Sequence, residues 1–598
     1  MAQQGFGLDD LFKMLGIPAP TRKHTTKDGE WTPSAEERAA RSRRMSKRLK
    51  VVLIVLILPV ILLAYWWFHP SLSIQSSDVW VFASIFVLLP VWALLRSRSR
   101  GYKQGTGRHE ASPSKSRLFK RLALIPVAIV VIGLIGGLAS SVVFPGNAKR
   151  YANVLVTESS DFSADIKEVN YSEIPIIDRD SAALLGNRVM GAIPEYVSQF
   201  EISDLYSQIN YRGHPVRVSP LVYADIFKWF NNRSEGLPAF VLIDMTTQNA
   251  QIVRLEEPMR YSQSEPFFRN IDRHVQLKYP FYIFDQISFE IDEDGNPWWV
   301  CPVQRRSISL FGGTTIARVI LCNANTGECT DLAIEDCPTW VDRVFPADLL
   351  IQQYNWSGAY KQGWINSWLG QEGVVQTTPG TNGLPGYNYI AKDDDVWVYT
   401  GVTSAVSDNS IVGFVLMNQR TAESHFYAIA GATEESAMNS AQGQVQHLGY
   451  KSTFPLLLNI NSQPTYFMAL KDNAGLVKMY AMLDIQRYQN VAVGSTLAEC
   501  QQNYLTLLRT NGVDVPEASR PDLLEVTGTV DHIATAVIEG NSHFYLSIVE
   551  DDNIYDCALP ALIDVVKLQE GDTVTLNYSE LDKLRIVESI TITPAVRE

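Results

Sequence analysis

The sequence predicts an α+β protein with an N-terminal membrane anchor, and three observations support this fold class. Three apolar runs occur within the first 150 residues. A strand–turn–strand–helix pattern then recurs between residues 236 and 510, and five strand-like runs in residues 521–598 suggest a small closed β-barrel. We therefore expect three transmembrane helices, an array of ββα units and a C-terminal barrel, in that order along the 598 residues.

The three apolar runs are long enough to cross a hydrocarbon core of about 30 Å at about 1.5 Å per residue. They are Val51–Phe68, Val79–Leu95 and Leu122–Phe144. None of them contains a charged residue, which is typical of an anchor and not of an ion or proton pathway. The third run contains Gly133, Gly136 and Gly137, small residues that allow close packing of helices.

The positive charges around these runs predict their orientation. The tail 1–50 and the loop 96–121 are rich in Lys and Arg, whereas the link His69–Asp78 contains neither. Because positive loops stay in the cytoplasm, we expect a multi-pass plasma-membrane protein with a cytoplasmic N-terminus. The loop 96–121 is then a flexible cytoplasmic linker, and the C-terminal domains, about 450 residues, are extracellular.

The charge balance agrees with this topology. Residues 1–150 hold 22 Lys and Arg against 8 Asp and Glu, while the rest of the chain holds 29 against 56. The basic part suits anionic headgroups, so membrane lipid is an expected partner, and the acidic part repels nucleic acid. A short amphipathic stretch, Leu8–Leu15, would bind a cytoplasmic partner, lie on the membrane surface, or simply fray.

Beyond the membrane, residues 151–235 predict a first α+β region. Its strand-like runs are Asn153–Thr157, Tyr196–Ile202 and Val216–Val218, and its helix candidates are Asp180–Val189, capped by Asp178 or Asp180, and Leu221–Asn231.

The array at 236–510 is predicted from recurring signals. Strand openings occur at Gly236-Leu-Pro-Ala-Phe240, Gly295-Asn-Pro-Trp-Trp299, Gly386-Tyr-Asn-Tyr389 and Ser462-Gln-Pro-Thr-Tyr466. Turn signals follow at Asp244–Thr247, Asn325–Gly327, Asn418–Thr421 and Asp472–Gly475, and helix starts at Ser264, Asp336, Thr433 and Thr496. Four such passes indicate degenerate duplication of a small unit.

This strand pattern resembles PepSY-like domains. The stretches Asn296–Val300, Trp340–Pro346 and Tyr466–Tyr480 also resemble an uncharacterised family of multi-pass membrane proteins from Gram-positive bacteria, over roughly residues 150–510. The PepSY resemblance implies binding or inhibition outside the membrane, often of peptidases. The family offers no known active site to carry over.

The C-terminal segment 521–598 resembles an OB-fold barrel. Its strands are expected near 525–538, 542–549, 553–559, 572–578 and 584–593, with a helical piece at Pro560–Lys567 between the third and fourth. Acidic residues outnumber basic ones here, which disfavours the nucleic-acid binding of many OB-folds and favours a protein contact.

Candidate chemistry in the sequence is sparse. Cys322 and Cys329 face each other across an expected hairpin and would form a disulfide, or else be two small buried side chains. No zinc spacing, catalytic triad or phosphate loop is present, so we expect no metal, no cofactor and no catalytic residue. The segment Asp292–Asn296 is interpreted as a hairpin turn in preference to a calcium loop.

One aromatic loop, 354–373, is a candidate binding site. Its aromatic residues recur about every four positions among Gly, Asn and Gln; they are Tyr354, Trp356, Tyr360, Trp364 and Trp368. Exposed aromatics beside amides stack on sugars or form binding hot spots, so a protein partner or cell-wall glycan would be the ligand. Alternatively, the loop packs across two repeats.

Together these features predict a membrane-anchored binding, scaffolding or regulatory protein of the bacterial cell envelope, without enzymatic activity. One alternative is an envelope hydrolase acting on wall or peptide, which needs a cleft with two facing carboxylates. Another is an accessory subunit of a membrane complex, which predicts an apolar face around Gly133 and Gly137.

Overall fold

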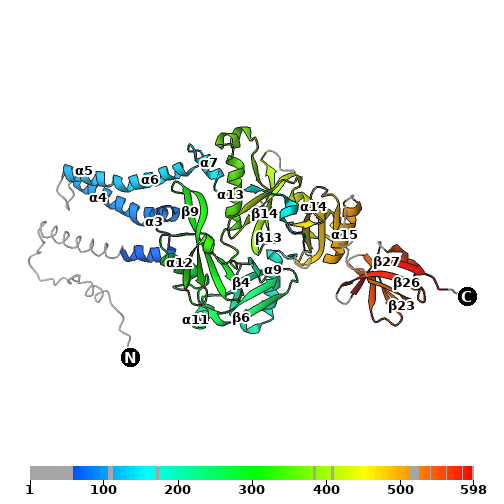
Figure 1. Ribbon diagram of the computed structural model, residues 1–598. Helices are drawn as coiled ribbons and strands as arrows, with labels where there is room; N and C mark the ends of the chain where they lie inside the picture. Colours follow the sequence, from blue (N-terminus) through cyan, green and yellow to red (C-terminus); the bar gives the residue numbers. More distant parts are fainter. Residues whose placement is uncertain are drawn as a thin grey trace, which may run out of the picture. The chain divides into compact units, whose positions relative to one another are not determined.

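The computed structural model describes two compact units (Figure 1). One unit comprises residues up to Pro70 and Asp78–Leu134, and the other comprises Ser71–Ser77 and Ile135–Glu598. We call the sheets of the second unit, residues 135–510, the outer body. The structure describes residues 58–104, 112–169, 174–380, 386–405, 410–510, 513, 524–538, 541–559, 562–581 and 584–595.

Among the described residues, two helical segments are long and apolar enough to cross a membrane, namely Ser77–Arg100 and Pro113–Ser140. Of the first expected span, the described part is a shorter apolar helix, Leu58–Phe68, and residues 51–57 lie outside the described residues. The three-span count and the orientation therefore stay predictions, as does the amphipathic stretch Leu8–Leu15, which also lies outside the described residues. The elements of these segments are α3 (Ser77–Ala83), η1 (Ser84–Leu88), α4 (Leu89–Gln104), α5 (Pro113–Leu122) and α6 (Leu124–Ser140).

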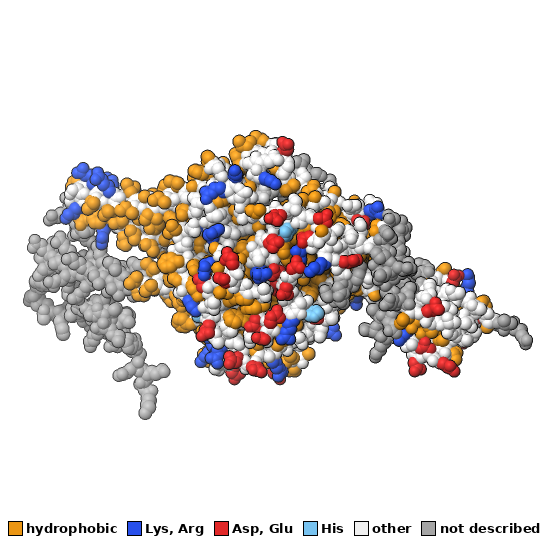
Figure 2. Space-filling view, viewed as in Figure 1, with side chains coloured by type: hydrophobic (Ala, Val, Ile, Leu, Met, Phe, Trp, Pro, Cys, Tyr) orange, Lys and Arg blue, Asp and Glu red, His pale blue; other side chains and the backbone are white. Residues whose placement is uncertain are grey.

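The linker expected at 96–121 is helical over most of its described residues. α4 and α5 pair because Ser99 and Ser116 each donate a hydroxyl hydrogen bond to the other's carbonyl oxygen, at 3.0 Å, and because Tyr102 stacks on Phe119. Basic side chains gather where α4 and α5 meet, and hydrophobic side chains cover α6 (Figure 2). The Ser-Gly-Arg composition suggested flexibility, but these buried hydroxyl bonds stabilise a helical hairpin.

The outer body consists of four sheets with one shared plan. In each sheet a long third strand pairs with both the first and second strands and, on its other side, with the fourth strand, which pairs with the fifth. The first sheet has β2 (Phe200–Ile202), β3 (Ser207–Tyr211), β4 (His214–Tyr223), β5 (Leu237–Asp244) and β6 (Ala250–Met259), and the second has β7 (Ile283–Phe284), β8 (Ser288–Ile291), β9 (Pro297–Ile308), β10 (Gly312–Asn323) and β11 (Cys329–Ala333).

The third and fourth sheets repeat this order. The third has β12 (Val375–Thr377), β13 (Asn388–Lys392), β14 (Asp395–Ser404), β15 (Ser410–Asn418) and β16 (Ser424–Tyr427), with β1 (Glu158–Ser159) and β17 (Gly431–Ala432) added. The fourth has β18 (Lys451–Ser452), β19 (Leu456–Ile460), β20 (Gln463–Lys471), β21 (Val477–Asp484) and β22 (Val491–Gly494). The units are thus five-stranded sheets, richer in strands than the expected ββα passes, and the first sheet includes strands on both sides of residue 236.

A single turn recurs between the fourth and fifth strands. Asp244, Asn323 and Asn418 each accept, through Oδ1, backbone N–H bonds from residues two and three positions later, at 2.7–3.1 Å. A Thr three positions on accepts a further N–H bond, and the next residue (Gln248, Gly327 or Ala422) has positive φ. Side-chain bonding of this kind lets Asn and Asp nucleate turns.

Three of the recurring signals were assigned to the wrong repeat position. The turn at Asp472–Gly475 joins β20 to β21, whereas Asp484 occupies the position equivalent to Asn418. Likewise, the openings at Gly236 and Gly386 lead into β5 and β13, and only those at Gly295 and Ser462 lead into the long third strand. Gly-Pro-aromatic signals mark any strand start, so they do not distinguish one strand from another.

One helix precedes each sheet, and the starts of α9, α12 and α14 follow from capping chemistry, whereas α13 begins after Pro346 without a side-chain cap. Asp178, Asn270 and Thr433 cap α9, α12 and α14 by accepting backbone N–H bonds, and Thr496 does the same for the final helix. The starts expected at Ser264 and Asp336 are wrong, because the helices there begin later. The helices are α9 (Arg179–Gly191), α12 (Ile271–Lys278), α13 (Ala347–Tyr360), α14 (Glu434–Gln444) and α15 (Leu497–Thr510).

Shorter elements complete the outer body. The strand expected at Asn153–Thr157 is absent; α7 precedes it and β1 follows it, and Leu155 is instead a buried core residue. The candidate Leu221–Asn231 is part strand β4 and part helix α11. The remaining elements are α7 (Asn147–Ala152), α8 (Phe162–Asp165), α10 (Pro194–Val197), α11 (Ile226–Asn232), η3 (Ile334–Asp336), η4 (Asn366–Gly370) and η6 (Gln446–Leu448).

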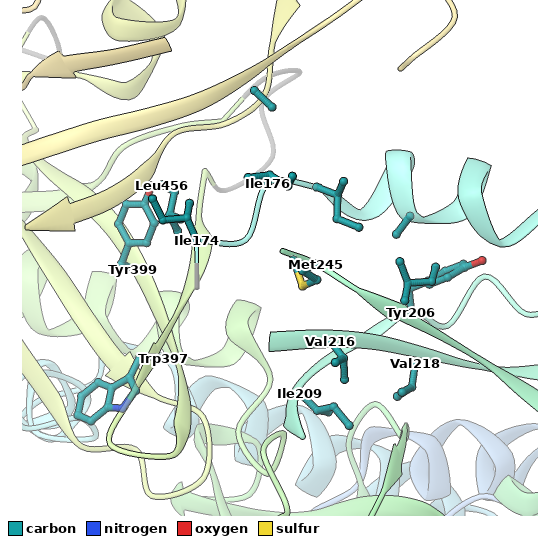
Figure 3. Packing of buried hydrophobic residues seen from close by; sticks show 14 of the residues in the cluster. Ile174, Ile176, Tyr206, Ile209, Val216, Val218, Met245, Trp397, Tyr399 and Leu456 are labelled. Carbon is teal, nitrogen blue, oxygen red and sulfur yellow. The ribbon is translucent and has the colours of Figure 1, made fainter. Parts of the chain in front are cut away.

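Two hydrophobic cores hold the sheets together. Consecutive residues of one strand point into different cores: Trp299 lies in the larger core and Val300 in the smaller, and Trp397 and Val398 of β14 divide in the same way. Figure 3 shows part of the larger core, where Trp397 and Tyr399 belong to the same cluster as residues of β3, β4 and β19. Since the side-chain period of a strand is two, β9 and β14 are buried on both faces.

The C-terminal strands close into a barrel in the order β23–β24–β25–β27–β26. They lie where the sequence predicts them, and the helical piece falls between the third and fourth. The elements are β23 (Leu524–Ile538), β24 (Asn541–Ile548), β25 (Ile554–Ala558), η8 (Ile563–Lys567), β26 (Thr573–Leu581) and β27 (Leu584–Thr593). Their interior is a third core that includes Leu546, Tyr555 and Val574.

Candidate functional site

The aromatic residues expected on a loop lie on a helix instead. Their four-residue spacing is helical, and α13 carries the first three. Tyr354 is buried in the smaller core, and the ring of Trp356 packs edge-on against Tyr151 at 4.8 Å, with Tyr360 near the same ring. These three side chains therefore pack against other parts of the protein, on a helix and not on the expected loop.

The last two aromatics form an exposed tip beyond α13. Trp364 and Trp368 stack at 6.4 Å with planes 14° apart, and Ile365, Trp368 and Leu369 are each 65–69% exposed. We call Trp364, Ile365, Trp368 and Leu369 the aromatic tip. It is held in shape by Asn366, whose side chain donates to the Glu372 carbonyl oxygen and accepts from the Glu372 N–H.

A second exposed apolar surface was not predicted. It lies on α11 and on the loop before α12, and its members are Ile226, Phe227, Phe230, Phe267 and Phe268. Behind it, Trp229 packs on Phe267 at 5.4 Å and donates to the buried carboxylate of Glu265 at 2.8 Å. The cluster of apolar side chains is visible in the sequence Ile226-Phe-Lys-Trp-Phe230. However, a predicted helix alone does not show which of its aromatic side chains stay exposed to solvent.

A polar cavity of about 320 Å³ is lined by strands of the first, third and fourth sheets and by connecting segments, two of which adjoin the second sheet. The first sheet contributes Gln208 and Arg217, the third Tyr389 and the fourth Phe467, while the connecting segments contribute Gln286, Arg343, Gln419 and Thr453. We call it the central cavity. Its size is at the lower end of the range for small-molecule sites.

Arg217 is the most unusual residue of this cavity. It lies on β4 between the buried Val216 and Val218 and is only 6% exposed. Its Nη2 donates to the amide oxygen of Gln208 at 3.0 Å, and its Nε has no hydrogen-bond partner. Burial lowers the pKa of the Arg217 guanidinium, because the charged form loses its hydration.

Arg343 repeats this arrangement at the same cavity. Its Nη2 donates to the amide oxygen of Gln286 at 2.9 Å, and its buried Nε also lacks a partner. Both arginines therefore have a neutral amide as the acceptor of their side-chain hydrogen bond. The positive charge of Arg343 also disfavours the charged form of Arg217, so the two guanidinium groups lie within electrostatic reach of each other.

Three carboxylates line the cavity, namely Asp178, Asp180 and Asp204, and the least exposed of them, Asp178, is already neutralised. Asp178 accepts from Lys471 Nζ at 2.6 Å and from the Ser181 N–H at 2.9 Å. Although burial alone would raise it, the pKa of Asp178 is lowered because these donors stabilise the carboxylate. Asp178 thus forms an ion pair with Lys471 and does not neutralise Arg217 as well.

A pair of carboxyl groups is buried nearby in the fold. Glu290 and Asp342 are 0% and 1% exposed, and Glu290 accepts backbone N–H bonds from Asp342 and Arg343. Burial raises the pKa of Glu290 to about 7, and burial together with the Glu290 charge raises that of Asp342. Neither residue lines the central cavity.

The sulfur atoms of Cys322 and Cys329 are bonded across the β10–β11 hairpin, where the two residues are paired in register. His274 lies close enough to these atoms to suggest a metal cluster within the described residues. However, joined sulfurs are not thiolate ligands, and His274 Nε2 is engaged with the Gly327 carbonyl oxygen at 2.8 Å.

The chain matches no protein-family model and no curated protein. Among solved structures, it is similar to the crystal structure of Bacillus subtilis levansucrase, with 11% identity. The match covers 73% of this chain and 100% of that chain, at a TM-score of 0.16. A similarity at this level supports no argument about fold or function.

Proposed function

We propose that this chain is a membrane-anchored binding protein whose outer body engages a protein partner through the aromatic tip. The observation that carries this proposal is the cluster of Ile365, Trp368 and Leu369, three large apolar side chains that are each about two-thirds exposed. Clustered exposed hydrophobics of this kind mark interaction sites, and Trp is enriched among binding hot spots.

The chemistry of the tip favours a protein over a glycan. Sugar recognition needs free polar groups beside the aromatic face, yet the Asn366 amide is occupied by the backbone of Glu372. Aliphatic side chains, Ile365 and Leu369, flank Trp368 instead. An apolar ridge with an indole ring is suited to insertion into a hydrophobic pocket of a partner.

The two apolar helices support an anchor role for the N-terminal part. A cytoplasmic N-terminus and a position in the cell envelope are part of this proposal, supported by the basic residues around these helices. We also propose that the four sheets are PepSY-like units and that the barrel is OB-like, supported by the shared strand plan and by the barrel's strand order.

The experiment is photo-crosslinking in intact cells with the full chain carrying a photoreactive phenylalanine at Trp368 or Leu369. One dominant protein adduct is expected, and it should disappear when Trp364 and Ile365 are also replaced by Ala. The matched control carries the same group at Val197, which is 52% exposed on α10.

An identical adduct pattern at Val197 and at the tip would contradict the proposal, because the tip would then have no preferred partner. A glycan adduct at Trp368 would overturn the choice of a protein. The same group placed at Phe227 tests whether the α11 surface contacts the same partner.

A further inference from the structure

We propose that the central cavity binds a small carboxylate with an apolar body, held by Arg217 and Arg343. This inference is independent of the aromatic tip and of the partner proposed for it. Its basis is a buried, permanently charged group without a counter-charge of its own, in a cavity large enough to hold a ligand.

The first step concerns the charge of Arg217. A buried carboxyl can shed its charge by taking up a proton, but a guanidinium keeps its proton in proteins. An unpaired buried charge is strongly unfavourable, and the hydrogen bond to the neutral Gln208 amide does not cancel it. A bound anion would.

The second step concerns several ionisable groups that act on the charge of Arg217. Its charged form is favoured by Tyr389 and Asp178 and disfavoured by Arg179 and Arg343. Asp178 is shared with Lys471, at 2.6 Å, so these two charges cancel. Arg179, Asp180 and Asp204 also line the cavity but are exposed, and Arg179 donates to the carbonyl oxygen of Asp204. Arg217 and Arg343 are therefore the more buried positive groups that a ligand would meet.

The third step concerns the form of the anion. The Nε of Arg217 and the Nε of Arg343 are both donors without partners. A planar carboxylate accepts two parallel N–H bonds from a guanidinium edge, and such charge-assisted bonds are about twice as strong as neutral ones. Each guanidinium thus keeps a donor that the described residues leave unpaired, and the two oxygens and four lone-pair sites of one carboxylate are acceptors that it could use after a small side-chain adjustment.

The fourth step concerns the rest of the ligand. Apolar and aromatic side chains make up much of the remaining wall, including Ile176, Met245, Tyr387, Phe454 and Phe467. Tyr387 and Tyr389 form an edge-to-face pair at 5.6 Å. A wall of this kind favours an aromatic or branched apolar body over a bare inorganic anion.

The test uses the full chain in detergent and three probes: phenylacetate, its neutral analogue phenylacetamide, and sulfate. Binding is measured by calorimetry and by the shift of the thermal unfolding temperature. Phenylacetate should bind the wild type and raise its unfolding temperature, while the other two probes should have little effect. Arg217→Met should weaken phenylacetate binding at least about tenfold, as loss of a charge-assisted pair predicts.

The matched control is Arg254→Met, which removes an exposed arginine from β6 in the same sheet and should leave binding unchanged. If Arg217→Met does not fold, Arg343→Met, at a half-buried position, takes its place and should also weaken binding. Equal binding of phenylacetamide, or binding that survives both substitutions, would overturn the carboxylate. Equal binding of sulfate would overturn the apolar body, and no binding of phenylacetate would overturn the site.

Discussion

Arg217 and Arg420 are two largely buried arginines of the outer body, and they differ in whether a carboxylate compensates their positive charge. Arg420 donates from Nε and Nη2 to the two carboxylate oxygens of Asp395, at 2.6 and 2.8 Å. Arg217 donates to an amide oxygen and leaves its Nε without a partner. Correspondingly, the Asp395 bond raises the pKa of Arg420, whereas burial lowers that of Arg217.

The difference separates a structural charge from one that is available to a ligand. Asp395 also accepts from the Asn418 amide at 2.7 Å, so it connects Arg420 to the residue that forms the repeated turn. That network is complete within the chain. The Arg217 site is not, and buried polar networks that are incomplete in a folded protein are often completed by what binds there.

The largest effect is expected at the complete pair. Asp395→Ala should lower the free energy of unfolding by about 4 kcal/mol, because it leaves a buried guanidinium and the Asn418 amide without their acceptor. Urea unfolding of the full chain in detergent measures this. The control, Glu195→Ala, removes an exposed carboxylate paired with the exposed Arg254 and should cost less than about 1 kcal/mol. Equal losses for both variants would show that the Arg420 pair contributes no more than a surface pair.

The next effect is expected at Glu290, a buried carboxyl group that, unlike an arginine, becomes neutral by binding a proton. Because the folded-state pKa of Glu290, about 7, lies above its ordinary 4.5, the folded protein holds an extra proton between these values. The stabilisation that comes from this proton is complete below about pH 4.5 and is lost as the pH rises through 7, by about 3 kcal/mol in total.

The variant Glu290→Gln should reduce this pH dependence, because a glutamine does not titrate and because the pKa of Asp342 falls when the Glu290 charge is removed. Unfolding midpoints at pH 5 and pH 8 in both proteins measure the effect. A wild type whose stability does not fall between these two pH values would contradict the raised pKa.

A smaller effect is expected at the incomplete site. Arg217→Met should leave the free energy of unfolding unchanged, or raise it by about 1 kcal/mol, when no carboxylate is added. Its opposite, Arg420→Met, should destabilise the chain because Asp395 then loses its cation. A large loss for Arg217→Met without ligand would mean that the Gln208 bond satisfies Arg217, and the contrast between the two arginines would fail.

The smallest effect is expected at the aromatic tip. Trp368→Ala should change the free energy of unfolding by less than about 0.5 kcal/mol, since the side chain is 69% exposed. Trp356→Ala, which removes the ring packed on Tyr151, should cost at least about 2 kcal/mol. Thermal unfolding of both variants distinguishes the exposed aromatic residues of the aromatic tip from the packing aromatic residues of α13.

Local chemistry is what the sequence predicts best in this chain. The caps at Thr433 and Thr496 and the turn at Asn418 are confirmed because each depends on bonds within a few residues. The strand positions of the C-terminal barrel follow from alternation and turn residues in the same way. The starts expected at Ser264 and Asp336 failed because capping residues also occur in loops.

The central cavity is beyond such reasoning. It joins Arg217 to Arg343, Tyr389 and Phe467, which are separated by tens to hundreds of positions and come from three sheets and one connecting segment. One signal was visible, namely a charged residue inside the strand Pro215-Val-Arg-Val-Ser219, whose neighbours are all buried. An arginine in a strand buried on both faces requires a partner, but the chain order does not say which.

The second compact unit is assembled from two separate stretches of chain, and this affects how it can be produced alone. Ser71–Ser77 belongs to the same compact unit as residues after Ile135. Within it, Leu72 donates its N–H to the Pro280 carbonyl oxygen at 2.6 Å, and the Gln75 amide donates to the Arg306 and Ser309 carbonyl oxygens. A soluble fragment beginning at residue 135 would leave these carbonyl groups uncovered. Joining Ser71–Ser77 to residue 135 by a short linker, which replaces the helices between them, would keep both stretches of the unit in one fragment.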